Sequence, residues 1–116
     1  MLLRIDQSST TPLFDQLAAS IRAAAISGGI TAGERLPAAR DLAESLDINV
    51  HTVLRAYQVL RDEGLVDLRR GRGAVVTDRA ARYVELSAAI DTVVAEARML
   101  DISSETVTAL LREALK

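Results

Sequence analysis

Three arginines fall within four positions of this sequence, at Arg69, Arg70 and Arg72, and they are interleaved with Gly71 and Gly73. A guanidinium group is always charged, and its planar set of donors matches the oxygens of a phosphate group. Glycine has no side chain, so the backbone of such a segment can approach a binding partner closely. The segment therefore predicts an exposed tip whose arginines contact phosphate oxygens.

A second set of candidate residues lies earlier in the chain, on one side of a segment with helical periodicity. This set is His51, Thr52, Arg55 and Gln58. The opposite side of the same segment is apolar and should face a core, and it consists of Val50, Val53, Leu54, Tyr57 and Leu60. Donors and acceptors on a helix face without apolar bulk suit hydrogen bonding to the edges of bases. Because outward helix faces are polar in most proteins, the pattern is equally that of an ordinary solvated face.

No arrangement typical of an enzyme accompanies these residues. The chain has no cysteine, and His51 is its single histidine, so no zinc or iron site can be built from thiolates or several imidazoles. No motif places a partner beside His51, and no glycine-rich phosphate loop is present. Adjacent acids such as Asp62 and Glu63 point to different faces of a helix. We therefore expect no catalytic residue, no metal and no cofactor.

The candidate residues need helices to position them, and the sequence predicts three. The first runs over residues 12–27, with Thr11 as its N-cap and Gly28-Gly29 at its end. The second covers residues 38–46. After a three-residue turn, Asn49 caps a third helix, and Gly64 suits the position just past its end. Two helices joined by so short a turn form a helix-turn-helix unit.

Two short strands follow the third helix directly. Residues 65–69 and 74–77 are rich in β-formers, and the glycine-containing segment 70–73 between them predicts a hairpin. A helix-turn-helix followed by such a hairpin is a winged helix. The predicted fold class is thus mainly α with a small β-hairpin, with residues 1–79 as a winged helix-turn-helix domain.

From Ala80 onward the pattern changes to a heptad repeat. Its apolar positions recur at alternating spacings of three and four: Tyr83, Leu86, Ile90, Val93, Ala97 and Leu100. Ser103 can cap a second tail helix, with Ile102 and Val107 placed as a hydrophobic staple and with Leu110 and Leu111 on its apolar face. A monomer would leave these stripes partly uncovered, so residues 80–116 predict a two-helix dimerisation region and a homodimer. The alternative is internal packing of the two helices without dimerisation.

Composition limits the remaining choices. The chain has 116 residues, of which 49% are apolar, and a formal net charge of −2, which by itself does not suggest nucleic acid. The charge is unevenly distributed, because residues 1–79 hold equal numbers of arginines and acids and the acid excess lies in residues 80–116. No apolar run approaches the length of a membrane span, and no signal peptide is evident. We expect a cytoplasmic protein without a membrane partner.

The order of these features resembles the DNA-binding domain of GntR-type bacterial transcriptional regulators. The resemblance covers residues 10–77, which are 68 of the 116 residues, and its most specific pieces are the ERLP loop with Arg40, the TVLRAYQVL helix and the EGLV and GRG segments of the wing. It implies that the third helix enters the major groove and the wing enters the minor groove. The short tail is similar to that of the YtrA-type subfamily, the smallest members of the family.

The resemblance also implies which residues contact DNA. Carried over by position and combined with the arginine tip, the expected set is Arg35, Arg40, His51, Thr52, Arg55, Arg70, Gly71 and Arg72. Two departures limit the transfer. Ala38 stands where the family commonly has a serine, so a capping and phosphate-contacting hydroxyl is missing, and Val50-His51 differs from the residues common there, so the bases cannot be copied across.

The function implied is that of a sequence-specific regulator, a repressor that binds a near-palindromic operator in double-stranded DNA as a homodimer. The alternative is a protein-binding winged-helix module without DNA affinity. A small-molecule effector of unknown identity could enter between the tail helices, although no residue marks a site for one. The dimer interface is expected to use Leu86, Ile90, Val93, Ala97, Leu100, Leu110 and Leu111.

Overall fold

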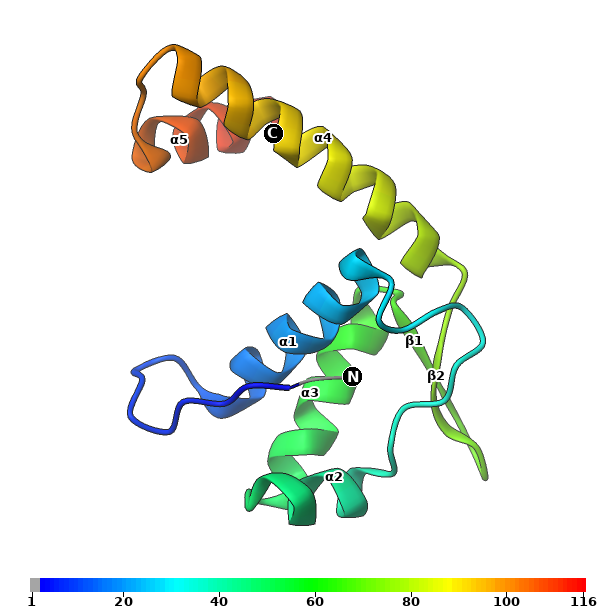
Figure 1. Cartoon of the computed structure of the whole chain (residues 1–116). Coiled ribbons are helices and arrows are strands. Elements are labelled where there is room, and N and C mark those ends of the chain that lie inside the picture. Colours follow the sequence, from blue (N-terminus) through cyan, green and yellow to red (C-terminus); the bar gives the residue numbers. More distant parts are fainter. Residues whose placement is uncertain (1–2) are drawn as a thin grey trace. The chain divides into compact units, whose positions relative to one another are not determined.

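The structure is a computed structural model that describes residues 3–116, which form five helices and one two-stranded hairpin (Figure 1). In chain order the elements are α1 (Leu13–Ser27), α2 (Ala39–Leu46), α3 (Val50–Asp62), β1 (Val66–Arg69), β2 (Gly73–Val76), α4 (Arg79–Met99) and α5 (Ser104–Ala114). The predicted fold class, mainly α with a small β-hairpin, is confirmed. Met1 and Leu2 of the predicted first domain lie outside the described residues.

The chain divides into two compact units, one that ends at Val84 and one that runs from Glu85 to Lys116. The first unit contains α1 to α3, the antiparallel hairpin of β1 and β2, and the start of α4. Ala80 is buried in the core of this unit, and Tyr83 packs against that core. Two residues that the sequence grouped with the tail therefore belong to the first unit.

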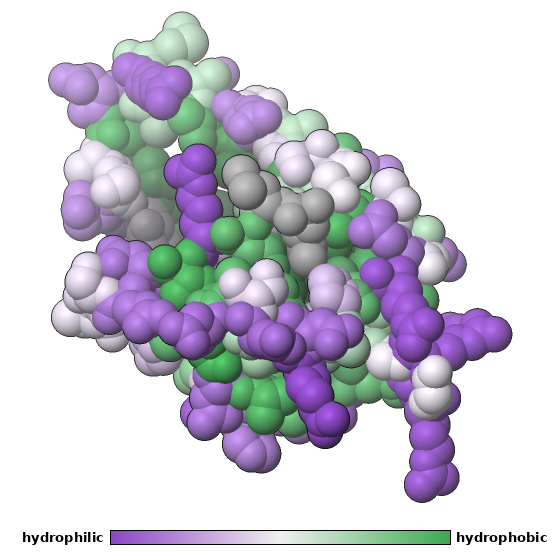
Figure 2. All heavy atoms as spheres, turned by 60° about the horizontal axis from the view of Figure 1, so that its bottom comes forward, coloured by the Kyte–Doolittle hydropathy of each residue, from purple (hydrophilic) through white to green (hydrophobic). Residues whose placement is uncertain are grey.

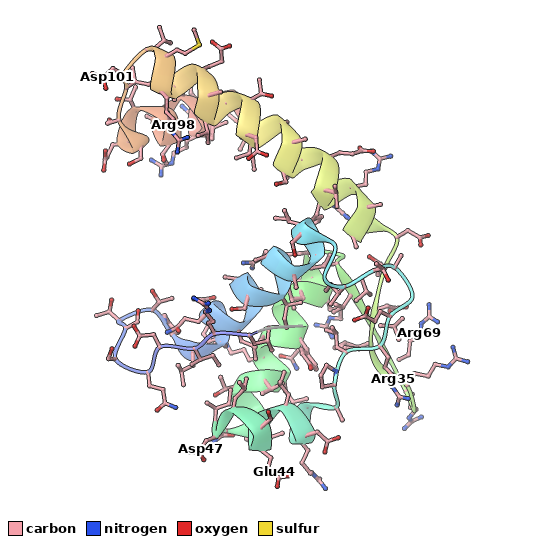
Figure 3. The ribbon with its side chains drawn as sticks, viewed as in Figure 1. Arg35, Glu44, Asp47, Arg69, Arg98 and Asp101 are labelled. Atoms are coloured by element: carbon pink, nitrogen blue, oxygen red, sulfur yellow. The ribbon has the colours of Figure 1, made fainter. Side chains whose placement is uncertain are left out.

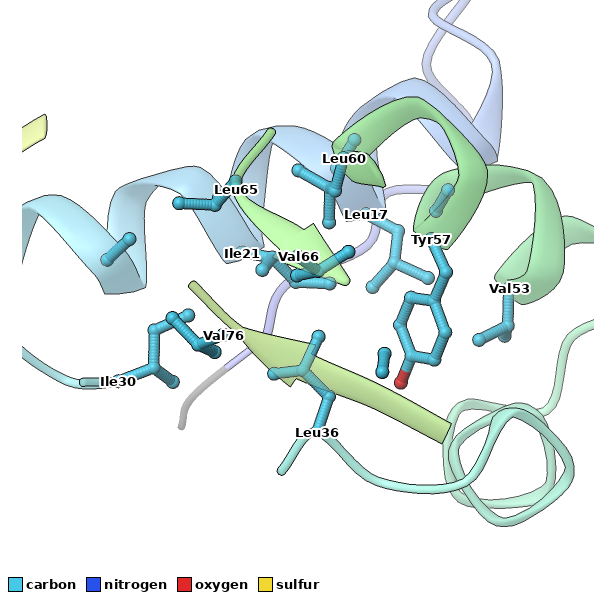
Figure 4. Close-up of a cluster of buried hydrophobic side chains, with 14 of the residues drawn as sticks. Leu17, Ile21, Ile30, Leu36, Val53, Tyr57, Leu60, Leu65, Val66 and Val76 are labelled. Atoms are coloured by element: carbon cyan, nitrogen blue, oxygen red, sulfur yellow. The ribbon is translucent and has the colours of Figure 1, made fainter. Parts of the chain in front are cut away.

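The core of the first unit is built from α1, α3 and the base of the hairpin (Figure 4). Leu17 and Ile21 lie one turn apart on α1 and are fully buried, as is Leu60 on α3. The helical spacing of these residues places them on one face, which explains why α1 and α3 pack against each other. Among the described residues no polar or charged side chain is buried, so apolar burial supplies the stability of this unit.

Most helices begin and end where the sequence predicts, because residues close to each end determine its position. The Asn49 side chain accepts a hydrogen bond from the His51 N–H at 2.8 Å and so caps α3. Gly64, just past α3, has a φ of 79°, a left-handed conformation that glycine adopts without strain. In the tail, Ser103 accepts a hydrogen bond from the Thr106 N–H at 3.1 Å and caps α5.

The predicted N-cap of the first helix is wrong. Helix α1 begins at Leu13, and Pro12 rather than Thr11 occupies the N-cap position, with no side-chain capping hydrogen bond. Pro12 has an extended ψ of 143°, and its carbonyl accepts the first helical hydrogen bond, from the Gln16 N–H at 3.1 Å. The Thr11 carbonyl instead accepts a hydrogen bond from the side-chain amide of Gln16 at 2.8 Å.

The inward assignment of Leu54 is also wrong, because this side chain is 41% exposed whereas that of Val53 is fully buried. Successive residues of an α-helix are rotated by about 100°, so Leu54 lies well to one side of the buried stripe. Val50 is half-buried at the edge of that stripe. Leu68 of β1 is likewise 37% exposed.

The segment before α2, predicted as a loop, pairs with the hairpin. The Leu36 N–H donates to the Ala74 carbonyl at 2.8 Å, and Arg35 forms an isolated antiparallel bridge with Val75. Residues 33–36 thus lie along the free edge of β2. This pairing positions Arg35 beside the wing.

Tyr57 joins α3 to the same segment through its hydroxyl, which donates a hydrogen bond to the Pro37 carbonyl at 2.7 Å. Burial raises the pKa of Tyr57 from its usual 10.0 to about 12. Because the unfolded chain releases this proton at lower pH than the folded protein does, the stability that Tyr57 contributes is complete below its unfolded pKa of 10.0 and is lost as the pH rises toward 12.

We expect Tyr57→Phe to lower the free energy of unfolding at neutral pH by about 1 kcal/mol, the net contribution of one hydrogen bond. The variant should also lose less stability than the natural protein when the pH is raised to about 11, because it has no phenol to ionise. Urea unfolding of both proteins at the two pH values measures the difference. An equally steep alkaline decline in both would contradict the role assigned to Tyr57.

Candidate nucleic-acid interface

The hairpin of β1 and β2, which is the wing of the predicted winged helix, ends in a tight basic turn. Arg69 pairs with Gly73 across the hairpin, and Gly71 and Gly73 have φ values of 80° and 71° in the left-handed region, which glycine adopts without strain. The side chains of Arg70 and Arg72 are exposed, and no carboxylate in residues 3–116 forms an ion pair with either. The turn therefore presents two arginines whose charge is available to a ligand.

Arg69 differs from its neighbours because its guanidinium pairs with Asp67, with Nε 2.9 Å from Oδ2. Figure 3 shows the side chains of Arg35 and Arg69 projecting near each other at the wing, one from the segment before α2 and one from the end of β1. Arg40 is exposed in the first turn of α2. Ala38 occupies the N-cap of that helix without a capping hydrogen bond, so the missing hydroxyl noted in the sequence leaves the cap empty.

On α3 the candidate reading residues lie where the helical pattern places them. His51 is exposed, and Thr52 is half-buried beside it in the first turn. Arg55 is also exposed, and its guanidinium carbon lies 3.8 Å from the centre of the Phe14 ring on α1. A cation over an aromatic face is held by the ring quadrupole. The orientation of Arg55 therefore depends on α1 as well as on α3.

A second contact between α1 and the end of α3 is ionic. The Nε of Arg22 lies 2.8 Å from Oε2 of Glu63, and the pair is bidentate, with each side chain 32% exposed. Hydrogen bonding to Glu63 raises the pKa of the Arg22 guanidinium. The bidentate geometry fixes the direction of both side chains, so this pair helps to hold the C-terminal end of α3 against α1.

A groove of about 500 Å³ separates α3 from the wing. It is bounded by α3, by the segment before α2 and by the hairpin. The lining residues are Arg35, Pro37, Ala38, Ala39, Leu54, Tyr57, Gln58, Leu68, Arg69, Arg70, Gly71, Gly73 and Ala74. Figure 2 shows hydrophilic side chains projecting from the molecular face at the bottom of Figure 1, with hydrophobic atoms exposed between them.

The groove brings together only part of the predicted set. Arg35, Arg70 and Gly71 line it. The remaining predicted residues lie outside its lining: Arg40, His51, Thr52, Arg55 and Arg72.

The sequence interpretation missed Leu54 as part of this region, because it assigned this side chain to the core on apolar character alone. For Leu54, its angular offset from Val53 and Leu60 on a helical projection was an available signal.

The second unit carries a different kind of surface. None of residues 85–116 is buried, although their apolar side chains include Leu86, which is 57% exposed, and Leu110, which is 61% exposed. Figure 1 shows α5 folding back along the end of α4. Between them lies a groove of about 400 Å³. Five of the predicted interface residues line it: Val93, Ala97, Leu100, Leu110 and Leu111.

In residues 3–116 no three side chains of the His, Cys, Asp and Glu types gather in a group that could hold a metal ion. No helix in this part of the chain has the length and apolar character that crossing a bilayer requires.

Comparison with known proteins relates this geometry to a family. The profile described as bacterial regulatory proteins, gntR family, matches residues 13–76. The chain is 33% identical over 79 residues to the HTH-type transcriptional repressor YtrA of Bacillus subtilis (strain 168), covering 68% of the chain and 61% of that protein. It is 34% identical over 101 residues to the HTH-type transcriptional regulator Rv1152 of Mycobacterium tuberculosis (strain ATCC 25618 / H37Rv), covering 87% of the chain and 84% of that protein.

Solved structures agree with the sequence matches. YtrA from Sulfolobus acidocaldarius, a GntR-family transcription factor, superposes with a TM-score of 0.64 at 34% identity, covering 82% of this chain and 99% of that one. A GntR family transcriptional regulator from Listeria monocytogenes gives a TM-score of 0.66 at 26% identity, covering 94% and 98%. The predicted resemblance, including the likeness to YtrA-type members, is confirmed. The chain therefore belongs to the GntR family of bacterial regulatory proteins, whose members are DNA-binding transcriptional regulators rather than enzymes.

Proposed function

We propose that this protein is a transcriptional repressor that binds a near-palindromic operator as a homodimer. In each protomer α3 enters the major groove and the wing enters the adjacent minor groove. The observation that carries the proposal is the groove between α3 and the wing, which Arg35 and Arg70 line together with Leu54 and Gln58 of α3. A surface that combines a helix with polar outward residues and a basic glycine-containing tip fits duplex DNA.

The candidate residues divide into two roles. Arg35, Arg40, Arg70 and Arg72 are exposed, and we assign them to phosphate oxygens, with the Gly71 backbone close to the minor groove. His51, Thr52 and Arg55 lie on the outward side of α3, and we assign them to base edges or flanking phosphates. The first group supplies affinity that depends on salt, and the second supplies discrimination between sequences.

Dimerisation is assigned to the second unit. Most of its large apolar side chains are exposed, and none of residues 85–116 is buried. An uncovered apolar stripe on two helices calls for a partner surface, and a second copy of the chain offers an identical one. The spacing of the stripe on α4 suits packing against another helix. We therefore propose an interface of Leu86, Ile90, Val93, Ala97, Leu100, Leu110 and Leu111.

Repression is proposed by analogy with the relative named as the transcriptional repressor YtrA. A dimer seated on an operator that overlaps a promoter would exclude RNA polymerase, and this requires no ligand-binding domain. A transcriptional repressor binds chromosomal DNA, which in a bacterium lies in the cytoplasm. We therefore propose a cytoplasmic location. The groove between α4 and α5 is the place where an apolar effector could act on the dimer.

The function is tested by selecting bound sequences from a random pool of duplex DNA with the purified protein. We expect enrichment of one two-fold symmetric sequence, with half-sites separated by about one helical turn or a small multiple of it. Affinity for the selected duplex should fall steeply as salt is raised, because phosphate contacts release counterions. Selection without any enrichment would overturn the proposal and favour a protein-binding winged-helix module.

A further inference from the structure

Two large apolar side chains are exposed on the first unit at the same place. Leu54 of α3 is 41% exposed and Leu68 of β1 is 37% exposed, and both line the groove between α3 and the wing. They come from separate elements and face one space, so they are not scattered surface residues. Pro37 and Ala74 continue this apolar lining.

The chemistry of the groove indicates what it holds. Arg35, Arg69 and Arg70 lie among its lining residues, and no aspartate or glutamate does. The guanidinium of Arg69 forms an ion pair with Asp67, whereas Arg70 has no carboxylate partner among the described residues. A lining that combines apolar and cationic side chains is complementary to a ligand that has apolar edges and negative charge. A DNA strand meets both conditions, because its phosphates are anionic and its deoxyriboses and thymine methyl groups are apolar.

The proposed docking places a particular part of the duplex in this groove. If α3 occupies the major groove and the wing the adjacent minor groove, the backbone that separates those two grooves has to pass between α3 and the wing. This step rests on the proposed function. The space between α3 and the wing is the groove that Leu54 and Leu68 line.

We propose that Leu54 reads a thymine through its 5-methyl group, at the edge of the major groove next to this backbone. Leu54 projects from α3, the element that faces base edges, and thymine is the standard base that presents an apolar group in the major groove. Leu68 projects from the wing and packs against the deoxyribose of the same strand. Leu54 therefore contributes specificity for a base, whereas Leu68 contributes affinity without discrimination.

The test replaces each thymine of the selected operator by uracil, one position at a time, which removes only the methyl group. Fluorescence anisotropy titrations then compare the natural protein with Leu54→Ala and Leu68→Ala. For the natural protein we expect one uracil position per half-site to weaken binding roughly three- to tenfold, the effect of burying one methyl group. Leu54→Ala should be insensitive to uracil at that position, whereas Leu68→Ala should bind more weakly but keep the sensitivity.

The outcomes separate this inference from the proposed function. If the natural protein binds the operator but no uracil substitution weakens binding, the proposed thymine contact is overturned and the proposed function stands. If Leu54→Ala keeps the same sensitivity to uracil, another residue makes the methyl contact and the assignment to Leu54 is overturned. Failure of the natural protein to bind any selected duplex overturns the function itself. The uracil scan of the natural protein needs no mutation, so it does not depend on how the variants fold.

Discussion

The double substitution Leu86→Glu and Ile90→Glu is expected to convert the dimer into a monomer and to weaken operator binding by roughly two to four orders of magnitude. Both side chains are exposed on α4, at 57% and 47%, so charges there cost a single chain little. In a symmetric interface each change occurs twice, so four carboxylates would be placed in one apolar contact. Burying an unpaired charge is costly, and the like charges also repel each other.

The loss of affinity follows from the geometry of two half-sites. When one protomer of a dimer is bound, the other is held near its half-site at a high effective concentration, and a monomer has no such advantage. Light scattering after size exclusion reports the mass of the protein, and anisotropy titration on the operator reports its affinity.

The matched control is Ala88→Glu. Ala88 is exposed on α4 and lies about 200° around the helix from Leu86, so this substitution adds a carboxylate on the opposite side of the helix. This control should remain dimeric and bind the operator normally. A double variant that still elutes as a dimer would refute the assigned interface. A monomer that binds as tightly as the natural protein would show that dimerisation does not supply the affinity.

Arg55→Ala is expected to weaken operator binding by about 1–3 kcal/mol, or roughly 5- to 150-fold, if its guanidinium reads a guanine. Affinity for a scrambled duplex should change much less, because that duplex does not place a guanine opposite Arg55. Anisotropy titrations of both duplexes provide the comparison. Equal losses on the two duplexes would mean that Arg55 holds only a phosphate.

Two further variants test whether Phe14 orients Arg55 and whether the loss of net charge alone weakens binding. Phe14→Leu keeps an apolar side chain but removes the ring on which the guanidinium rests at 3.8 Å, so it should weaken operator binding by about 0.5–1 kcal/mol. This effect should vanish in an Arg55→Ala background if Phe14 acts by orienting Arg55. Arg61→Ala controls for net charge, because Arg61 is an exposed arginine of α3 that pairs with Asp62.

The arrangement of the first unit explains why distant residues bear on the surface of α3. Phe14 and Arg22 of α1 contact Arg55 near the middle of α3 and Glu63 just past its end. Tyr57 ties the same helix to the Pro37 carbonyl in the segment before α2. These contacts lie on different sides of α3 and restrain its rotation. A helix that reads bases needs such restraint, because a small rotation would displace every contact on its outward side.

Much of the fold could be predicted from the sequence because its signals are local. Asn49 caps α3 through a residue two positions away, and Ser103 caps α5 through one three positions away. Gly64 ends α3 through its own backbone conformation. Apolar spacing on α1 and α3 was enough to identify the buried faces that hold them together. The elements, their order and the position of the basic tip thus depend on interactions within a few residues.

Only the tertiary structure decided which side chains meet. Arg35 reaches the wing by pairing with Val75, forty residues later in the chain, and Arg55 rests on Phe14, which is forty-one residues earlier. Leu54 has an apolar side chain typical of a core residue, yet it is 41% exposed and lines an open groove. Apolar periodicity shows which residues can be buried, but actual burial depends on the neighbouring elements, and contacts between distant segments leave no local pattern in the sequence.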